Sequence, residues 1–235
     1  MSEAPPFKAD LGLGLRPGDA HYRAYVGPPE DYDLVAAMTF NLLTTLGLRQ
    51  QHTLLDIGCG SLRCGRLFIP YLNPGCYVGI EPNQWLIDDG ISKEVGADQV
   101  RIKQPHFFVG GGPEVLAGSG VVADFAVAQS IFSHCGLDLI DTWLRGLAPF
   151  LAPTGALAAT FLIADEDFGG SGWVYPECVS FTRRSLEQAA AAAGLRLQVL
   201  DWRHPRQTWA LLTREDFDGA WLAGKPLSWN TRMGG

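Results

Sequence analysis

The stretch from Leu54 to Gly65, LLDIGCGSLRCG, constrains the fold of this chain more than any other part of its sequence. The apolar run Thr53–Ile57 carries one acid and predicts a short, buried strand of a parallel sheet. Gly58, Cys59 and Gly60 predict a tight turn, and helical spacing follows over Leu62–Ile69. In such a unit the glycines let the backbone approach a ligand closely, and the helix offers unpaired N–H groups. The stretch therefore predicts a nucleotide-binding crevice.

Alternating strand and helix patterns fill residues 31–213. Strands are predicted over Thr53–Ile57, Tyr77–Ile80, His106–Val109, Asp124–Ala128, Ala156–Ile163, Arg196–Leu200 and Trp209–Thr213. Helices are predicted over Asp31–Leu46, Leu62–Ile69, Asn83–Glu94, Leu137–Leu151 and Thr182–Ala193. Pro105 makes Val100–Val109 ambiguous, and Pro153–Gly155 predicts a turn. The alternation predicts a doubly wound α/β sheet whose ligands bind beyond the carboxyl ends of the strands. Residues 1–30 are expected to form an N-terminal arm or strap, and residues 214–235 a C-terminal tail.

The charge balance disfavours a nucleic-acid-binding protein. The 235 residues fit one α/β domain with modest extensions, and the net charge is −7. The best basic cluster is Arg203, His204 and Arg206, which is too small to neutralise a phosphate backbone. We therefore expect no nucleic-acid partner.

Cysteine usage and hydropathy indicate the compartment. The five cysteines are an odd number without a C-x-x-C pair, so neither a zinc site nor a disulfide framework is predicted. The first ten residues lack the apolar core of a signal peptide, and no apolar run is long enough to span a membrane. A soluble, cytoplasmic protein with reduced thiols is the expectation.

Four motifs in this order resemble the class I S-adenosylmethionine-dependent methyltransferases: LLDIGCG, YVGIEPN, DFAVAQSIFSH and LAPTGALAATF. More narrowly, DIGCGSLRCGRLFIPYL with a late HPRQTW is similar to a bacterial group of mostly uncharacterised methyltransferases. The resemblance implies a Rossmann-like sheet of seven strands, the last antiparallel, and S-adenosylmethionine as cofactor. The dinucleotide fingerprint G-x-G-x-x-G is not matched, because Leu62 and Arg63 follow Gly60, and this disfavours NAD.

The resemblance also implies roles for cofactor-binding residues. Those residues are Asp56, Gly58, Cys59, Gly60, Arg63, Glu81, Pro82, Gln129 and Ser130. Glu81 would accept hydrogen bonds from both ribose hydroxyls, and Asp56 would hold the glycine turn or reach the methionine ammonium. Arg63 would bind the methionine carboxylate or form a structural salt bridge. No acid follows the third strand to contact adenine, so Trp85 or Phe108 would cover the ring.

His134 is the candidate catalytic residue, because it follows the fourth strand where the methyl group would be presented. A histidine can take a proton from a nucleophile near neutral pH, although this one could instead cap the next helix or hold its loop. Tyr25, Trp173 and Tyr175 are predicted to contact the substrate, with plain packing as the alternative. The acidic run Asp165–Asp167 lacks the Asp-Asn pair of metal-assisted methyl transfer, so no metal is predicted.

The function favoured by these residues is methyl transfer to a small molecule, with oxygen preferred as the acceptor atom. SIFSH stands where a (D/N)PPY motif would follow the fourth strand, which disfavours methylation of adenine or glutamine amino groups. A methyltransferase acting on a protein or peptide is one alternative, and RNA is disfavoured by the acidic balance. A non-catalytic module that binds S-adenosylmethionine is the alternative from another class.

Overall fold

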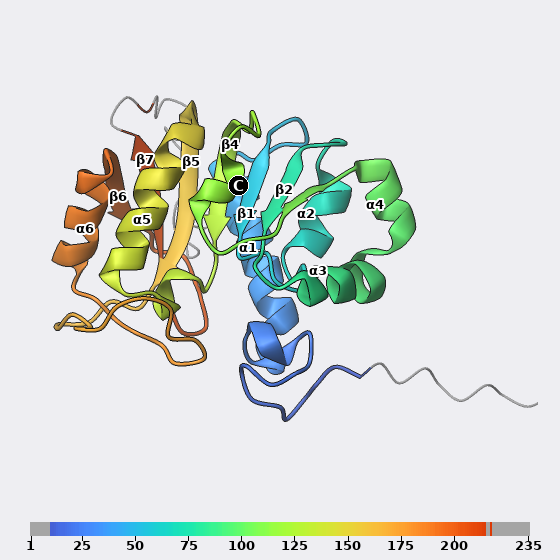
Figure 1. Cartoon of the computed structure of the whole chain (residues 1–235), viewed down its shortest axis with the longest axis horizontal. Coiled ribbons are helices and arrows are strands. Elements are labelled where there is room, and N and C mark those ends of the chain that lie inside the picture. The colour runs from blue at the N-terminus through green and yellow to red at the C-terminus, as the bar shows by residue number, and fades with distance from the viewer. Residues whose placement is uncertain (1–9, 215–216, 218–235) are drawn as a thin grey trace, which may run out of the picture.

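A single mixed sheet of seven strands forms the centre of the computed structural model, which describes residues 10–214 and 217 (Figure 1). The strands are β1 (Leu54–Ile57), β2 (Tyr77–Ile80), β3 (His106–Phe108), β4 (Ala123–Ala128), β5 (Leu151–Phe161), β6 (Leu195–Val199) and β7 (Thr208–Arg214). Their order is β3-β2-β1-β4-β5-β7-β6, and β7 alone runs antiparallel, to both β5 and β6. This confirms the expected doubly wound sheet with an antiparallel last strand.

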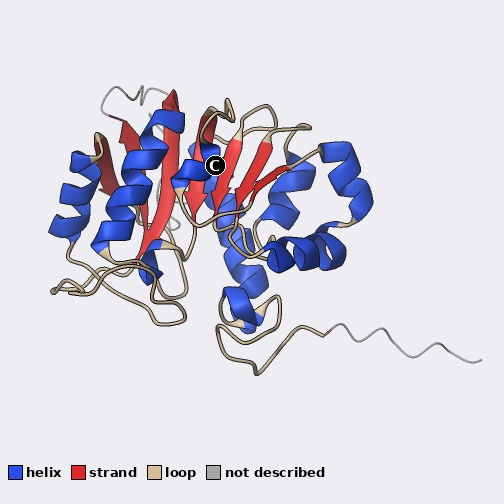
Figure 2. Cartoon of the chain, in the orientation of Figure 1, coloured by secondary structure: helices blue, strands red, loops and turns tan. Residues whose placement is uncertain are grey.

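Helices cover both faces of this sheet (Figure 2). They are α1 (Tyr32–Leu46), α2 (Gly65–Tyr71), α3 (Gln84–Gly90), α4 (Ala97–Lys103), α5 (Leu137–Leu147) and α6 (Arg183–Ala192). Side chains of β1 alternate between the two cores, with Leu54 packed in the core of α1 and α2 and Leu55 in the core of α5 and α6. The segment that follows β1 packs on one face of the sheet, and the segment that follows β4 packs on the other. A crevice therefore opens between the carboxyl ends of these two strands.

The fifth strand begins earlier than expected, at Leu151, and ends at Phe161 rather than Ile163. The expected turn at Pro153–Gly155 is part of this strand, and α5 ends at Leu147. The pairing register shifts between Ala123 and Phe125 of the neighbouring strand, so Pro153 sits where the ladder is irregular. A proline is tolerated there because its missing N–H interrupts no regular pairing.

Two helical regions also differ from expectation. The helix predicted from Leu62 begins only at Gly65, because Leu62 has a left-handed backbone with φ 59°. The ambiguous segment divides into α4, which ends before Gln104 with φ 49°, and the predicted third strand. Pro105 disfavours helical backbone in the residue before it, which explains where α4 ends. The predicted N-cap is confirmed, since Thr182 Oγ1 accepts from the Ser185 N–H at 3.2 Å.

Residues 10–31 pack across the carboxyl ends of the strands, as the blue segment below the sheet in Figure 1. Arg23 forms a buried ion pair with Glu94 at 2.7 Å, and the Tyr22 hydroxyl donates to the same carboxylate at 3.0 Å. The Arg23 guanidinium also lies over the Tyr32 ring, 4.5 Å from its centroid. These contacts hold the segment, which is called the strap below, against α1 and the residues after α3. Residues 1–9 of the expected arm, and most of the expected C-terminal tail, lie outside the described residues.

Within residues 10–214, no helix is long and apolar enough to cross a membrane.

Candidate active site

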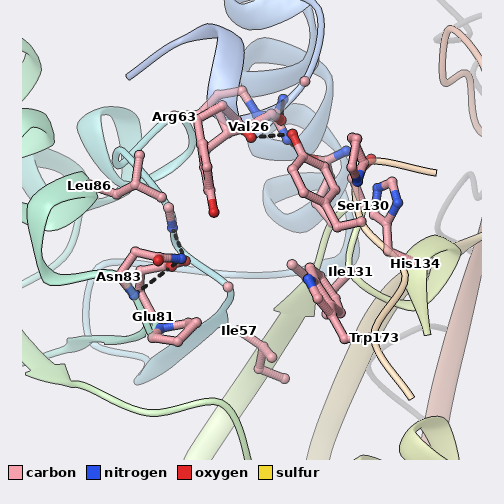
Figure 3. A pocket seen from close by; sticks show the side chains of 18 of the residues that line it. Val26, Ile57, Arg63, Glu81, Asn83, Leu86, Ser130, Ile131, His134 and Trp173 are labelled. Carbon is pink, nitrogen blue, oxygen red and sulfur yellow. Dashed lines mark hydrogen bonds between the residues drawn. The ribbon is translucent and has the colours of Figure 1, made fainter. Parts of the chain in front are cut away.

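A cavity of about 530 Å³ opens at the carboxyl ends of β1, β2 and β4, beneath the strap (Figure 3). Its lining includes eleven of the predicted site residues: Tyr25, Gly58, Gly60, Arg63, Glu81, Pro82, Gln129, Ser130, His134, Trp173 and Tyr175. Two of the predicted cofactor residues, Asp56 and Cys59, do not line it. The structure therefore brings most of the candidates together around one space.

The glycine turn forms the floor of this cavity. Gly58 and Gly60 have left-handed backbones, with φ 65° and 53°. A Cβ on Gly58 would lie 2.1 Å from Ile131 Cδ1, and one on Gly60 would lie 2.7 Å from Val26 Cγ1. Glycine is required at both positions, for the backbone conformation and for the space.

Glu81 stands at the end of β2 with its carboxylate buried beside the turn. Its Oε2 accepts from the Gly60 N–H at 3.1 Å, and its Oε1 accepts from the N–H and Nδ2 of Asn83 at 2.9 and 2.8 Å. Burial raises the pKa of Glu81, while the hydrogen bonds from Asn83 and Gly60 oppose that rise. Both oxygens are thus held in place. Oε1 already accepts two hydrogen bonds, whereas Oε2 accepts one and keeps a lone pair for a ligand hydroxyl.

Asp56 and Cys59 lie behind the turn. The Tyr77 hydroxyl donates to Asp56 Oδ2 at 2.7 Å, and burial raises the pKa of Asp56 to about 7. The Cys59 thiol packs against Gly79, where a Cβ would lie 2.8 Å from Sγ, and burial raises its pKa well above the ordinary value. Cys59 is a small packing residue in this position, without the thiolate character that reactivity requires.

Arg63 places a guanidinium in the cavity wall with only 8% of the residue exposed. Nη1 donates to the Val26 carbonyl oxygen at 2.8 Å, and Nη2 donates to Gln129 Oε1. No carboxylate among the described residues lies within 4.0 Å of this guanidinium. A buried cation without an acidic partner is unfavourable, so the wall offers a binding site for an anion.

The segment after β4 is held by a residue of β5 and by residues of the segment that precedes β7. Ser130 has φ 58°, and its N–H donates to Thr160 Oγ1 of β5 at 2.8 Å. Gln207, which precedes β7, donates from Nε2 to Ser130 Oγ at 2.7 Å and to Ser133 Oγ at 3.0 Å. Gln129 Nε2 lies 3.1 Å from Nε2 of His204, a residue of the same late segment.

His134 presents one ring nitrogen to the protein and leaves the other free. Nδ1 lies 2.6 Å from the Glu177 carbonyl oxygen, which can only accept, so Nδ1 carries the proton. Within the described chain Nε2 has no hydrogen-bond partner. Burial lowers the pKa of His134 below 6.5, so the ring is neutral near pH 7 and its Nε2 lone pair is available.

Aromatic rings form one wall of the cavity around His134. Tyr175 lies edge-on to the His134 ring at 4.8 Å between centroids, and Trp173 lies 5.8 Å from it. Tyr25 of the strap is 5.8 Å from Tyr175 and packs edge-on against Trp85 at 5.1 Å. The three predicted substrate residues are therefore neighbours, although they come from segments 150 positions apart.

The residues proposed to cover adenine do not line the cavity. Trp85 rests on Tyr25, and Phe108 packs against the α5–α6 core. Near Glu81 the lining comes instead from Asn83, Leu86, Gly110 and Gly111. Sequence reasoning missed these residues and Gln207; the run of three glycines after β3 and the HPRQTW segment were the available signals.

No family model and no curated protein matches this chain. Among solved structures it is similar to magnesium protoporphyrin IX methyltransferase from Synechocystis with bound S-adenosylhomocysteine, at 14% identity over 78% of this chain and 83% of that one, with a TM-score of 0.57. The CcbJ methyltransferase from Streptomyces caelestis shares 15% identity over 80% of this chain and 91% of that one, with a TM-score of 0.58. Mitomycin 7-O-methyltransferase shares 14% identity over 82% of this chain and 56% of that one, also with a TM-score of 0.58. At these identities the likeness establishes the fold, which is that of the class I S-adenosylmethionine-dependent methyltransferases.

Proposed function

We propose that this protein is an S-adenosylmethionine-dependent methyltransferase that transfers a methyl group to a small molecule, with oxygen as the acceptor atom. The observation that carries the proposal is that Arg63 and Glu81 line the same cavity. Arg63 is a buried guanidinium without a carboxylate partner among the described residues, and Glu81 is a buried carboxylate held in a fixed orientation. S-adenosylmethionine has the matching groups, a carboxylate at one end and a ribose diol in the middle.

The chain's own residues divide the binding task. Glu81 accepts from the two ribose hydroxyls: one bonds to the free lone pair of Oε2, and the other replaces the Asn83 Nδ2 hydrogen bond at Oε1. Arg63 binds the carboxylate, and the backbone at Gly58 and Gly60 lies against the ligand between them. Asp56 supports the turn from behind through Tyr77 and does not reach the ligand. When bound, S-adenosylmethionine supplies a methyl group already activated on a positively charged sulfur.

His134 is the general base in this proposal. The Glu177 carbonyl fixes the ring and keeps the proton on Nδ1, so Nε2 takes the proton of an acceptor hydroxyl. Tyr25, Trp173 and Tyr175 hold the acceptor by stacking and edge contacts, which supplies proximity and orientation. A hydroxyl group must lose its proton when it is methylated, so it benefits from a general base. The presence of a candidate base therefore supports a hydroxyl as the acceptor over a nucleophile that needs no base.

A small acceptor is supported by the shape of the site. The strap and the loop that follows β5 roof the cavity, and its volume of about 530 Å³ is typical of small-molecule sites. Two of the similar structures are named for a porphyrin and for mitomycin as the molecules methylated. We also propose that the protein belongs to the bacterial group of methyltransferases with the DIGCGSLR motif and that it is located in the cytoplasm.

Binding is tested first, by thermal shift with S-adenosylhomocysteine. Native-state binding must raise the unfolding temperature, so no shift at saturating ligand would refute the proposal. Methyl-labelled S-adenosylmethionine is then incubated with the protein and producer-cell extract, and the products are separated by size. We expect label in the small-molecule fraction. Label only in macromolecules would indicate a protein or peptide acceptor, and binding without transfer would indicate a non-catalytic module.

A further inference from the structure

His204 lies behind the cavity wall, in the segment between β6 and β7. It does not line the cavity, and its ring packs edge-on against Trp209 with 6.0 Å between centroids. Nδ1 faces the backbone N–H groups of Arg206 at 3.2 Å and Gln207 at 3.0 Å. Nε2 faces the Gln129 side-chain amide at 3.1 Å. The ring therefore connects a backbone turn to a residue of the cavity wall.

The two backbone donors determine where the proton of this ring lies. Backbone N–H groups can only donate, so Nδ1 must be the accepting nitrogen and Nε2 must carry the hydrogen. Burial, together with the charges of Arg63 and Arg206, lowers the pKa of His204 to about 4, so the ring stays neutral near pH 7. His204 is thus a fixed donor towards Gln129.

The hydrogen-bonded side chains of Arg63, Gln129 and His204 then contain more donors than acceptors. The Arg63 guanidinium and His204 Nε2–H donate from opposite sides, and the Gln129 amide has one oxygen to offer. With Oε1 on Arg63, the Gln129 NH₂ meets the His204 N–H, and two donors face each other. Turning the amide by half a rotation satisfies His204 and leaves the Gln129 NH₂ beside the guanidinium. Both orientations leave an acceptor to be supplied by a ligand.

We infer that His204 is a positioning residue for the ligand carboxylate. It holds the Gln129 amide with Oε1 turned towards Nε2–H, so that Gln129 Nε2 and the Arg63 guanidinium donate together to one carboxylate in the cavity. This rests on the proposed function, because the carboxylate is that of S-adenosylmethionine. The sequence element responsible is HPRQTW, which leads into β7. Because β7 pairs with β5, this element reaches the residues that follow β4.

The test uses two variants of the full chain and two ligands, with binding measured by titration calorimetry. His204→Asn keeps an acceptor near the Nδ1 position for the backbone turn and loses the donor to Gln129. His204→Gln keeps a donor near the Nε2 position. The ligands are S-adenosylhomocysteine and its decarboxylated analogue, which lacks only the carboxylate.

We expect His204→Asn to weaken S-adenosylhomocysteine binding about tenfold, which corresponds to one hydrogen bond to a charged group. The decarboxylated analogue should bind this variant as it binds the wild type, which also shows that the variant is folded. His204→Gln should recover part of the lost affinity. Equal weakening of both ligands, or wild-type affinity of His204→Asn for S-adenosylhomocysteine, would overturn the inference. A wild-type protein that binds neither ligand would instead refute the proposed function, and the inference with it.

Discussion

The Tyr175 hydroxyl donates a hydrogen bond to the backbone carbonyl oxygen of Tyr25, and the two rings lie 5.8 Å apart. This contact joins the loop that follows β5 to the N-terminal strap, over the cavity. The strap is also tied to the segment that follows the glycine turn, because Arg63 donates to the neighbouring Val26 carbonyl oxygen. The cover of the cavity is therefore built from two segments that meet at Tyr175 and at the neighbouring Pro176, which lies beside Gly18.

Tyr175→Phe should loosen the strap without removing the aromatic wall. The variant loses one hydrogen bond, worth roughly 1 kcal/mol, and keeps the ring contacts with Tyr25 and His134. Hydrogen exchange measured by mass spectrometry should rise in the peptides covering residues 17–28 and stay unchanged in β1 and β4. Exchange that is unchanged in the strap would show that its other contacts, including Arg23–Glu94 and Arg63–Val26, hold it without this hydrogen bond.

Glu81→Gln should weaken binding of S-adenosylhomocysteine by about 10- to 100-fold, since the charge-assisted hydrogen bonding between the carboxylate and the ribose is lost. The neutral amide also brings an NH₂ group against the donors of Gly60 or Asn83. Titration calorimetry should give the same loss for the decarboxylated analogue, because the ribose is common to both ligands. A loss confined to S-adenosylhomocysteine would place Glu81 at the carboxylate end and contradict the assignment.

His134→Asn separates the proposed base from its structural role. The Asn side-chain amide can still donate to the Glu177 carbonyl, as Nδ1 does now, but it has no basic nitrogen for the acceptor. Turnover in the labelled-extract assay should fall by about 10²- to 10⁴-fold while the affinity for S-adenosylhomocysteine is retained. Undiminished turnover would leave His134 with the loop-holding role only.

The same residue should shape the pH profile. The base must be neutral, and burial lowers the pKa of His134 from its ordinary value, so the wild-type rate should be constant around neutral pH and fall as the pH drops through that lowered pKa. The residual rate of His134→Asn should lack this acid limb. A limb that persists unchanged in the variant would have to arise from another group.

The fold was predictable because each signal was local. The glycine turn, the short apolar strands and the caps each determine their own element, and the order of elements determines a doubly wound sheet. Errors occurred where tertiary pairing overrides a local signal. Pro153 predicts a turn, but the irregular pairing beside Ala123 accommodates it inside β5.

The site was predictable only in part, for a related reason. Gly58 and Glu81 stand in short motifs, whereas Gln207 enters the cavity because β7 pairs antiparallel to β5, a long-range fact. Asp56 has the same limitation: its position before the glycine turn suggests a ligand contact, but its partner is Tyr77 on the neighbouring strand. Which side of a strand end faces the ligand is set by packing that the local sequence does not contain.

Asp56 should make the stability of the ligand-free protein depend on pH. Burial is the largest cause that raises its pKa from 3.8 to about 7, and the Tyr77 hydrogen bond opposes it. Between these two values the folded state holds a proton that the unfolded state has released. The contribution of Asp56 to stability is therefore fully present below pH 3.8 and is lost as the pH rises towards 7.

Asp56→Asn removes this titration and keeps an oxygen for the Tyr77 hydroxyl. Urea unfolding at pH 5 and pH 8 should show the variant gaining stability relative to the wild type at the higher pH, because contributions from all other groups cancel in the difference. Asp98→Asn is the matched control, since its side chain is 91% exposed and should give the same difference at both pH values. A wild-type and an Asp56→Asn protein whose stabilities run parallel from pH 5 to pH 8 would mean that Asp56 is ionised in the folded state throughout. The negative charge of Asp56 would then need a compensating positive charge near the glycine turn. Arg63, whose charge lowers the pKa of Asp56, would supply it, and its guanidinium would then be less available to a ligand carboxylate.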